Sequence, residues 1–151
     1  MPHLPVFRGD LSGPIRVRTR NGYRWMVVLV SPLGLGLVAF QRRKSDTWMT
    51  YATNKVEWEA LMQDGFAGSV HLSDRGTEYT DVRFRALMKE WGVLCRYTAP
   101  DSSAGTAENR IRTIQEMGAA AAHAAGAPQM FWAEAMLHAN DWVNFMPSDA
   151  H

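Results

Sequence analysis

Three acidic residues stand in separate segments of the chain and could together support metal chemistry. Asp10 precedes a Gly-Pro pair, Asp74 follows a short apolar run, and Glu108 precedes alternating Arg and Ile residues. Two Asp and one Glu that converge in space supply hard oxygen ligands, which Mg²⁺ favours. Two such ions are what in-line displacement at a phosphodiester needs. The three residues therefore predict a site for two Mg²⁺ or Mn²⁺ ions.

Each acidic residue also has a simpler structural interpretation. Asp10 fits a turn before Gly-Pro, and Asp74 fits an ordinary loop. Glu108 fits the acidic position that stabilises a helix N-terminus. Taken singly, these interpretations are at least as good as a metal ligand. The segments around the three residues, taken together, favour the metal site.

The residues after Glu108 predict a polar helical face. Glu108, Arg112 and Gln115 are spaced i, i+4, i+7 and so share one side of a helix. This side could place Arg112 against a DNA phosphate, with Arg110 and Gln115 as further DNA-binding candidates. An i, i+4 ion pair on a solvated face explains Glu108 and Arg112 equally well.

Composition restricts the class of protein. The 151 residues are 46% hydrophobic and fit one globular domain. The single Cys95 allows neither an internal disulfide nor a cysteine zinc site, and the five His residues lack metal-ligand spacing. No apolar run approaches the length of a membrane span, and no signal peptide is visible, so we expect an intracellular protein without membrane contact.

Four extended runs are predicted in the first third of the chain. They cover Leu4–Asp10, Ile15–Thr19, Tyr23–Val30 and Leu35–Phe40. Asn21-Gly22 is a strong hairpin signal between the second and third runs. The continuous β-branched run inside Tyr23–Val30 predicts a strand that is buried on both faces. We expect three consecutive antiparallel strands, with Asp10 at the carboxyl end of the first.

Helices and strands then alternate. A helix is expected from Ser45 or Asp46 to Gln63, with Trp48, Ala52, Val56 and Ala60 at helical spacing. The remaining elements are a strand at Ser69–Ser73, a helix from Asp81 to Gly92, a strand at Val93–Thr98, and helices at Thr106–Ala125 and Gln129–Phe145. The order βββ-α-β-α-β-α-α predicts an α/β fold, a mixed five-stranded sheet flanked by helices.

Basic residues gather in two segments. Arg16, Arg18, Arg20 and Arg24 alternate along the first predicted hairpin, and a run from Arg42 to Lys44 ends the third strand. These side chains could contact a DNA backbone. A solvated hairpin surface explains them at least as well, and the sequence alone favours that explanation.

Three other polar residues are assigned to structure. His71 lies on a predicted strand before Asp74, so we expect it to be buried and not catalytic. Cys95 is expected to be a small core residue. Glu78 is expected to be structural and not a metal ligand.

Four segments resemble the integrase catalytic core of copia-type (Pseudoviridae) LTR retrotransposons, over about residues 8–148. They are Gly9-Asp10-Leu11-Ser12-Gly13-Pro14-Ile15, Ser73-Asp74-Arg75-Gly76-Thr77-Glu78-Tyr79, Gly105-Thr106-Ala107-Glu108-Asn109-Arg110-Ile111-Arg112-Thr113 and Phe131-Trp132-Ala133-Glu134-Ala135. The resemblance implies a ribonuclease H-like fold and a DDE polynucleotidyl transferase that trims element DNA ends and joins them to target DNA. Asp10, Asp74 and Glu108 match its catalytic metal-binding carboxylates.

The resemblance also implies DNA as the partner, a possible homodimer or multimer, and action in the nucleus. We expect residues 1–151 to form one catalytic core domain, without a zinc-binding or C-terminal DNA-binding domain. Some positions differ from the family pattern: Arg75 replaces an Asn, the second strand ends without its acidic element, and the segment Pro100–Gly105 is short. These differences motivate an alternative, a catalytically silent domain that binds nucleic acid or a protein. A nuclease for RNA–DNA hybrids is a third hypothesis, which the Phe131–Ala135 segment disfavours.

Overall fold

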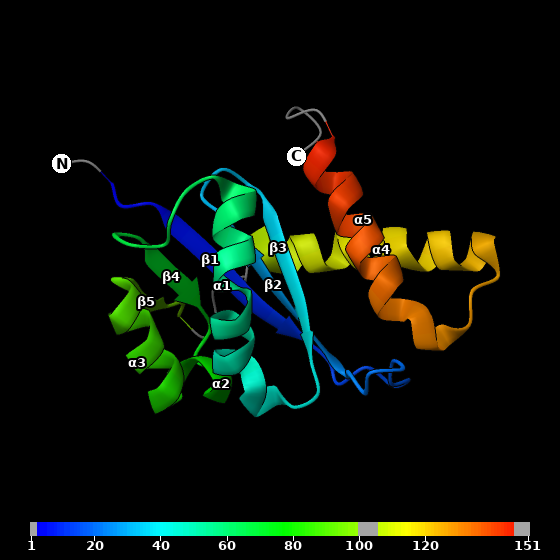
Figure 1. Cartoon of the computed structure of the whole chain (residues 1–151), viewed down its shortest axis with the longest axis horizontal. Helices are drawn as coiled ribbons and strands as arrows, with labels where there is room; N and C mark the ends of the chain where they lie inside the picture. The colour runs from blue at the N-terminus through cyan, green and yellow to red at the C-terminus, as the bar shows by residue number, and fades with distance from the viewer. Residues whose placement is uncertain (1–2, 100–105, 147–151) are drawn as a thin grey trace.

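The computed structural model describes residues 3–99 and 106–146, and its centre is a mixed five-stranded sheet (Figure 1). The strands are β1 (Val6–Ser12), β2 (Trp25–Val30), β3 (Gly36–Gln41), β4 (Val70–Ser73) and β5 (Leu94–Tyr97). Their spatial order is β3-β2-β1-β4-β5. Strands β1, β2 and β3 pair antiparallel, whereas β4 and β5 join β1 in parallel. The predicted α/β fold with a mixed sheet is therefore confirmed.

Helices cover both faces of the sheet. One face carries α1 (Thr47–Met62), α2 (Thr77–Thr80) and α3 (Val82–Trp91), with a one-turn 3-10 helix, η1 (Lys44–Asp46), before α1. The other face carries α4 (Thr106–Ala125) and α5 (Trp132–Phe145), which follows the 3-10 helix η2 (Gln129–Phe131). Figure 1 shows α4 and α5 crossing on the side of the sheet away from α1.

Two hydrophobic cores result, one on each face of β2. Val27 and Leu29 pack under α1 and α3 with Phe7 and Phe84. Met26, Val28 and Val30 face α4 and α5, beside side chains that include Ile111, Ile114 and Ala139. The prediction that this strand is buried on both faces is confirmed, because a central strand between two helical layers alternates its side chains between two cores.

Four expectations about the elements were wrong. Strand β1 does not end at Asp10 but continues to Ser12. The run Ile15–Thr19 is not a strand, although a turn does form near Gly22, which has a φ of 80°. The short helix α2 was missed, and the last predicted helix is divided into η2 and α5.

In the part of the chain that the structure describes, no helix is long and apolar enough to cross a membrane.

Candidate functional site

Asp10 lies inside β1 and points toward α4. It pairs with Val28 across the antiparallel β1–β2 ladder, and paired residues project to the same face of a sheet. Val28 belongs to the core under α4 and α5, so the Asp10 side chain lies on that face. One of its carboxylate oxygens, Oδ1, accepts the backbone N–H of Leu11 at 2.8 Å. The ladder and this hydrogen bond fix the direction of the carboxylate.

Asp74 follows the last residue of β4, next to β1. The parallel register pairs Val6 with Val70 and Arg8 with Leu72. Continuing this register by two residues brings Asp74 level with Asp10. Asp74 is exposed, and its Oδ1 accepts the N–H of Gly76 at 2.8 Å. Two carboxylates from neighbouring parallel strands are therefore placed at the same level of the sheet.

Glu108 lies in the first turn of α4, which packs along β1 and β2. Ile111 and Ile114 are buried against the sheet, as predicted. Gln115, two turns after Glu108 on the same side of the helix, donates from Nε2 to Ser12 Oγ at 2.9 Å. Ser12 lies on the same face of β1 as Asp10, so this hydrogen bond holds the polar side of α4 against the strand that carries Asp10.

The electrostatic environment of Asp10 reflects this arrangement. The pKa of its carboxyl is raised to about 6, mainly by partial burial and also by the negative charges of Asp74, Glu108 and Glu78, against a lowering effect of the Leu11 N–H. Like charges raise a carboxyl pKa because they disfavour a second ionised group nearby. The structure thus brings the three predicted acidic residues into electrostatic contact. A divalent cation would relieve this repulsion.

The three carboxylates do not form a closed ligand set. Among residues 3–99 and 106–146, no group of three His, Cys, Asp or Glu side chains has an arrangement that could hold a metal ion. The unusual segment before Glu108, residues 100–105, lies outside the described residues. The oxygen-only character of Asp10, Asp74 and Glu108 fits Mg²⁺ or Mn²⁺ by ligand type.

Glu78 lies next to this group, in a buried setting that includes an ion pair. Its side chain is buried, with 7% of the residue exposed, and its Oε2 accepts no hydrogen bond. Lys44 Nζ lies 3.5 Å from that oxygen, which makes an ion pair without hydrogen-bond geometry. A Cβ on Gly76 would lie 2.6 Å from Glu78 Oε1, so Gly76 leaves the space that this carboxylate fills under the Asp74 loop. No sequence pattern indicates the pairing, because Lys44 and Glu78 are distant in the chain.

Arg110 is not available for the predicted DNA contact. Only 9% of the residue is exposed, and its guanidinium donates to the carbonyl of Gly34 at 2.5 Å and to Asn144 Oδ1 at 3.0 Å. It joins α4 to the β2–β3 turn and to α5, which is a structural role. Arg112, by contrast, is exposed beside Glu108 on α4, as a phosphate contact requires.

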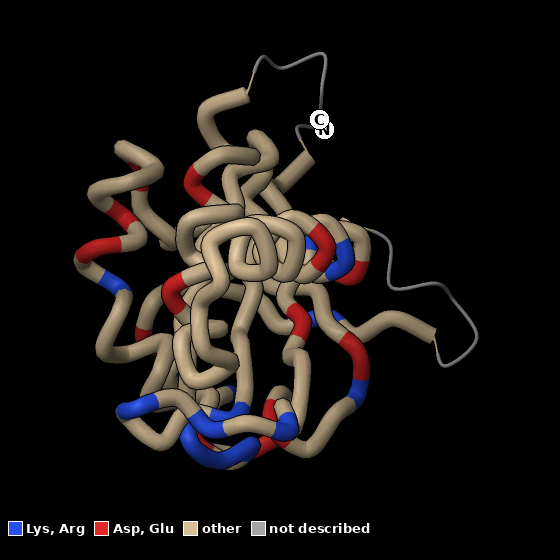
Figure 2. The backbone as a smooth tube through the Cα atoms, turned by 90° about the vertical axis from the view of Figure 1, so that its right-hand side faces the viewer, with Lys and Arg blue, Asp and Glu red and all other residues tan. Residues whose placement is uncertain are grey.

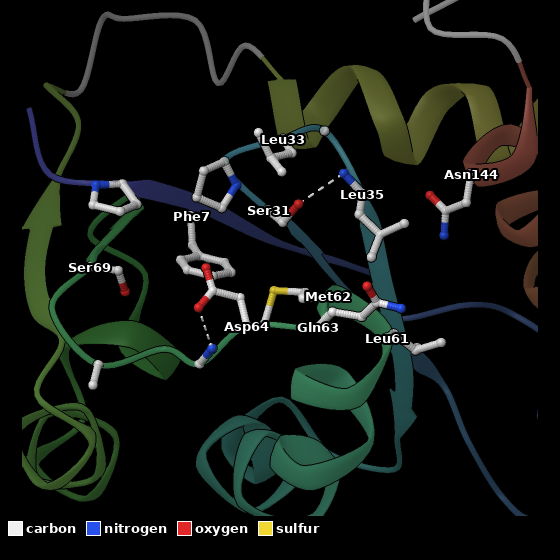
Figure 3. Close-up of a pocket in the computed structure, with 15 residues that line it drawn as sticks. Phe7, Ser31, Leu33, Leu35, Leu61, Met62, Gln63, Asp64, Ser69 and Asn144 are labelled. Atoms are coloured by element: carbon white, nitrogen blue, oxygen red, sulfur yellow. Dashed lines mark hydrogen bonds between the residues drawn. The ribbon is translucent and has the colours of Figure 1, made fainter.

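One cavity of about 680 Å³ lies away from the three carboxylates (Figure 3). The start of β1, the β2–β3 turn and the end of α1 line it, with Phe7, Leu35 and Met62 among its walls. None of the three acidic residues lines this cavity, so it is not the candidate site.

Comparison with known proteins agrees with the fold. No protein-family profile matches the chain. Over 150 residues, 96% of its length, the chain is 25% identical to the retrovirus-related Pol polyprotein from transposon TNT 1-94 of Nicotiana tabacum, and it spans 11% of that polyprotein. This is a distant homology to a copia-type Pol polyprotein.

Solved structures of integrases have the same fold. The magnesium complex of the HTLV-2 integrase catalytic core domain, in its dimeric form, matches 95% of the chain and 90% of its own length, with a TM-score of 0.69 at 14% identity. The simian T-cell lymphotropic virus intasome gives a TM-score of 0.72 at 16% identity, over 95% of this chain and 50% of that one. The catalytic core of BIV integrase gives 0.63 at 17% identity, over 94% and 84%. The chain therefore has the ribonuclease H-like fold of an integrase catalytic core.

Proposed function

We propose that the chain is a metal-dependent polynucleotidyl transferase that processes DNA 3′ ends and joins them to target DNA. Asp10, Asp74 and Glu108 would hold two Mg²⁺ or Mn²⁺ ions. The observation that carries the proposal is the raised pKa of Asp10, to about 6, in a position that is level with Asp74 and faces the helix of Glu108. Carboxylates whose pKa is shifted by burial and by neighbouring charges cluster at functional sites.

The residues of this chain would have distinct tasks in that reaction. The ions, when bound, activate the attacking hydroxyl and stabilise the leaving oxygen of a phosphodiester. Asp10, held by the β1 ladder, and Asp74, held by the Gly76 N–H, present fixed oxygens from the sheet. Glu108 would contribute a third carboxylate from α4, and the hydrogen bond between Gln115 and Ser12 keeps that helix in place.

Arg112 would contact DNA beside this group. It is exposed one turn after Glu108, and an arginine there can bind a backbone phosphate. Gln115 is half-buried and already bonded to Ser12, so we assign it to positioning first. By analogy with the HTLV-2 core in its dimeric form and with the viral intasome, we further propose that the chain acts as a dimer or multimer on DNA, inside the nucleus.

Calorimetric titration with Mn²⁺, followed by a strand-transfer assay, tests this function. Asp74→Asn should abolish both metal binding and turnover. Asp64→Asn is a matched control, because Asp64 is also an exposed loop residue whose Oδ1 accepts a nearby backbone N–H, that of Gly65 at 2.9 Å. Equal activity of wild type and Asp74→Asn would contradict the proposal.

A catalytically silent, nucleic-acid-binding domain is the second candidate. It is favoured by the finding that the described residues contain no three-residue group arranged to hold a metal. This candidate predicts salt-sensitive DNA binding with no turnover in either Mg²⁺ or Mn²⁺. Carboxylate-dependent strand transfer would exclude it.

A further inference from the structure

Positive charge is concentrated in two short segments of the chain. Residues 13–24 and 42–44 contain seven of the 16 Lys and Arg residues and none of the 15 Asp and Glu residues. The rest of the chain contains nine basic residues and all 15 acidic residues, so its formal charge is −6. The net charge of +1 is therefore the sum of a strongly basic region and an otherwise acidic protein.

Both segments lie at the same end of the molecule. The N–H of Arg24 donates to the carbonyl of Gln41 at 3.0 Å, and Arg42 Nε donates to the carbonyl of Asn21 at 2.9 Å. The Arg42 guanidinium also lies over the ring of Tyr23. Figure 2 shows several Lys and Arg segments close together at the lower end of the tube, apart from others higher on the molecule.

Residues 13–24 form a loop and not the expected hairpin, and hydrogen bonds fix the conformation of this loop. Trp132 Nε1 on α5 donates to the carbonyl of Val17, which fastens the middle of the loop to a helix. The Thr19 hydroxyl accepts the N–H of Tyr23 at 3.1 Å and the Thr19 carbonyl accepts the N–H of Gly22 at 2.9 Å. Val17 and Thr19 face the protein, and the alternating Arg16, Arg18 and Arg20 remain exposed.

Few of these charges are neutralised within the protein. Arg20 has a weak contact with Glu134 at 3.9 Å, and Lys44 pairs with Glu78. Within the described ranges, Arg16, Arg18 and Arg43 have no acidic side chain within ion-pair distance. A rigid loop with unpaired guanidinium groups loses little side-chain and backbone freedom when it binds phosphates.

We propose that this basic surface, formed by Arg16, Arg18, Arg20, Arg42 and Arg43, binds the phosphate backbone of duplex DNA. The inference rests on the proposed function for its choice of partner, because the loop continues directly from the strand that carries Asp10. The exposed residues of the loop are three arginines, one asparagine, one glycine and one proline. Its aromatic Tyr23 is covered by Arg42 and stacks on Phe40. This composition fits phosphate contacts and offers neither base stacking nor an apolar face for a lipid surface.

The test is fluorescence anisotropy with a labelled random-sequence DNA duplex in EDTA, over a series of salt concentrations. We expect wild type to lose affinity steeply with salt, by about 0.9 log units per log unit of salt for each phosphate contact. The triple variant Arg16→Ala, Arg18→Ala, Arg43→Ala should bind at least about tenfold more weakly at low salt. Its slope of log affinity against log salt concentration should be shallower than that of wild type by about 2 to 3. These residues are exposed, so the variant's melting temperature should stay unchanged.

A matched triple variant controls for net charge. Arg85→Ala, Lys89→Ala, Arg96→Ala removes three exposed basic residues from α3 and β5 and should leave the slope within about 1 of wild type. If both triple variants bind equally, or if anionic vesicles or single-stranded RNA bind more tightly than duplex DNA, the proposal is overturned. The binding assay contains no metal, so its result does not depend on turnover. A wild type that binds DNA with the expected salt slope, a reduced slope in the Arg16, Arg18 and Arg43 variant, and no strand transfer by wild type would together contradict the proposed enzyme and support this surface.

Discussion

The Tyr51 hydroxyl lies 2.7 Å from His71 Nε2, and this buried pair packs directly against Gly9, the residue before Asp10. A Cβ on Gly9 would lie 2.7 Å from His71 Nε2 and 2.9 Å from the Tyr51 oxygen. The glycine therefore permits the hydrogen bond to form against the backbone of β1. It follows that α1 and β4 together define the position of the strand that presents Asp10.

Replacing Gly9 by alanine should destabilise the protein. The new methyl group would force the two rings or β1 to move, and overpacking of this kind costs roughly 1–3 kcal/mol. Urea unfolding of Gly9→Ala measures the loss. Gly65→Ala is the control, because a Cβ there would meet only the flexible Glu59 carboxylate at 3.1 Å and should cost much less. Equal stabilities for the two variants would show that the pair at Gly9 yields easily.

His71 should make stability depend on pH. Burial lowers its pKa to about 3, from an ordinary value of 6.5. Below pH 6.5 the imidazole is protonated in the unfolded chain but stays neutral in the folded chain, so His71 lowers the free energy of unfolding as pH falls toward 3. The free energy of unfolding then changes by up to about 1.4 kcal/mol per pH unit. Asp10, with its raised pKa, acts in the opposite direction between about pH 4 and 6.

Because the two groups oppose each other, the difference between variants is the useful measurement. The unfolding free energy of wild type minus that of His71→Gln should decrease as pH is lowered from 6 to 4. The same difference for His123→Gln, which replaces an exposed histidine, should stay flat. Parallel curves for wild type and His71→Gln would refute the assignment of a buried neutral imidazole.

Arg110 should matter for stability and not for DNA binding. Arg110→Ala leaves the carbonyl of Gly34 and the Asn144 side chain without their guanidinium partner, which should cost roughly 2–3 kcal/mol. Arg112→Ala, on the exposed side of the same helix, should change stability by less than about 0.5 kcal/mol and weaken DNA binding. Thermal melts and duplex binding at 10 °C separate the two effects. A folded Arg110→Ala protein with much weaker DNA binding would restore the original expectation for this residue.

Replacing Lys44 and replacing Glu78, the two partners of one ion pair, should have unequal effects on stability. Lys44→Met leaves a buried carboxylate without a cation and should cost about 1 kcal/mol, a small value because Lys44 is half exposed. Glu78→Gln removes a charge that lies near Asp10 and has no hydrogen bond at Oε2, so it should be neutral or stabilising. Denaturant unfolding of both, with the exposed Lys89→Met as reference, checks the asymmetry. A larger loss for Glu78→Gln than for Lys44→Met would mean that the carboxylate makes a contact that requires its charge.

Local signals predicted the fold well, and distant contacts explain the failures. Helix α4 has the predicted bounds, and Gly92 ends α3 with a φ of 75°, as a glycine C-cap should. The buried contacts of Arg110 could not be read from local sequence, because its partner Gly34 is 76 residues away in the chain. The position of Asp10 inside β1 was missed because pairing with β2, and not local composition, carries that strand to Ser12.

Helix α1 shows the same limit and gives a final prediction. The apolar spacing of Trp48, Ala52, Val56 and Ala60 suggested the buried side, yet Val56 is 79% exposed and Trp58 is buried. Gln41 donates a hydrogen bond to Thr47 and accepts one from Thr50, so the first turns of α1 direct these polar residues toward the sheet. Trp58→Ala should therefore cost roughly 3–5 kcal/mol, whereas Val56→Lys should change stability by less than about 0.5 kcal/mol, as measured by urea unfolding. The reverse order would mean that α1 packs on the face that its apolar spacing suggested.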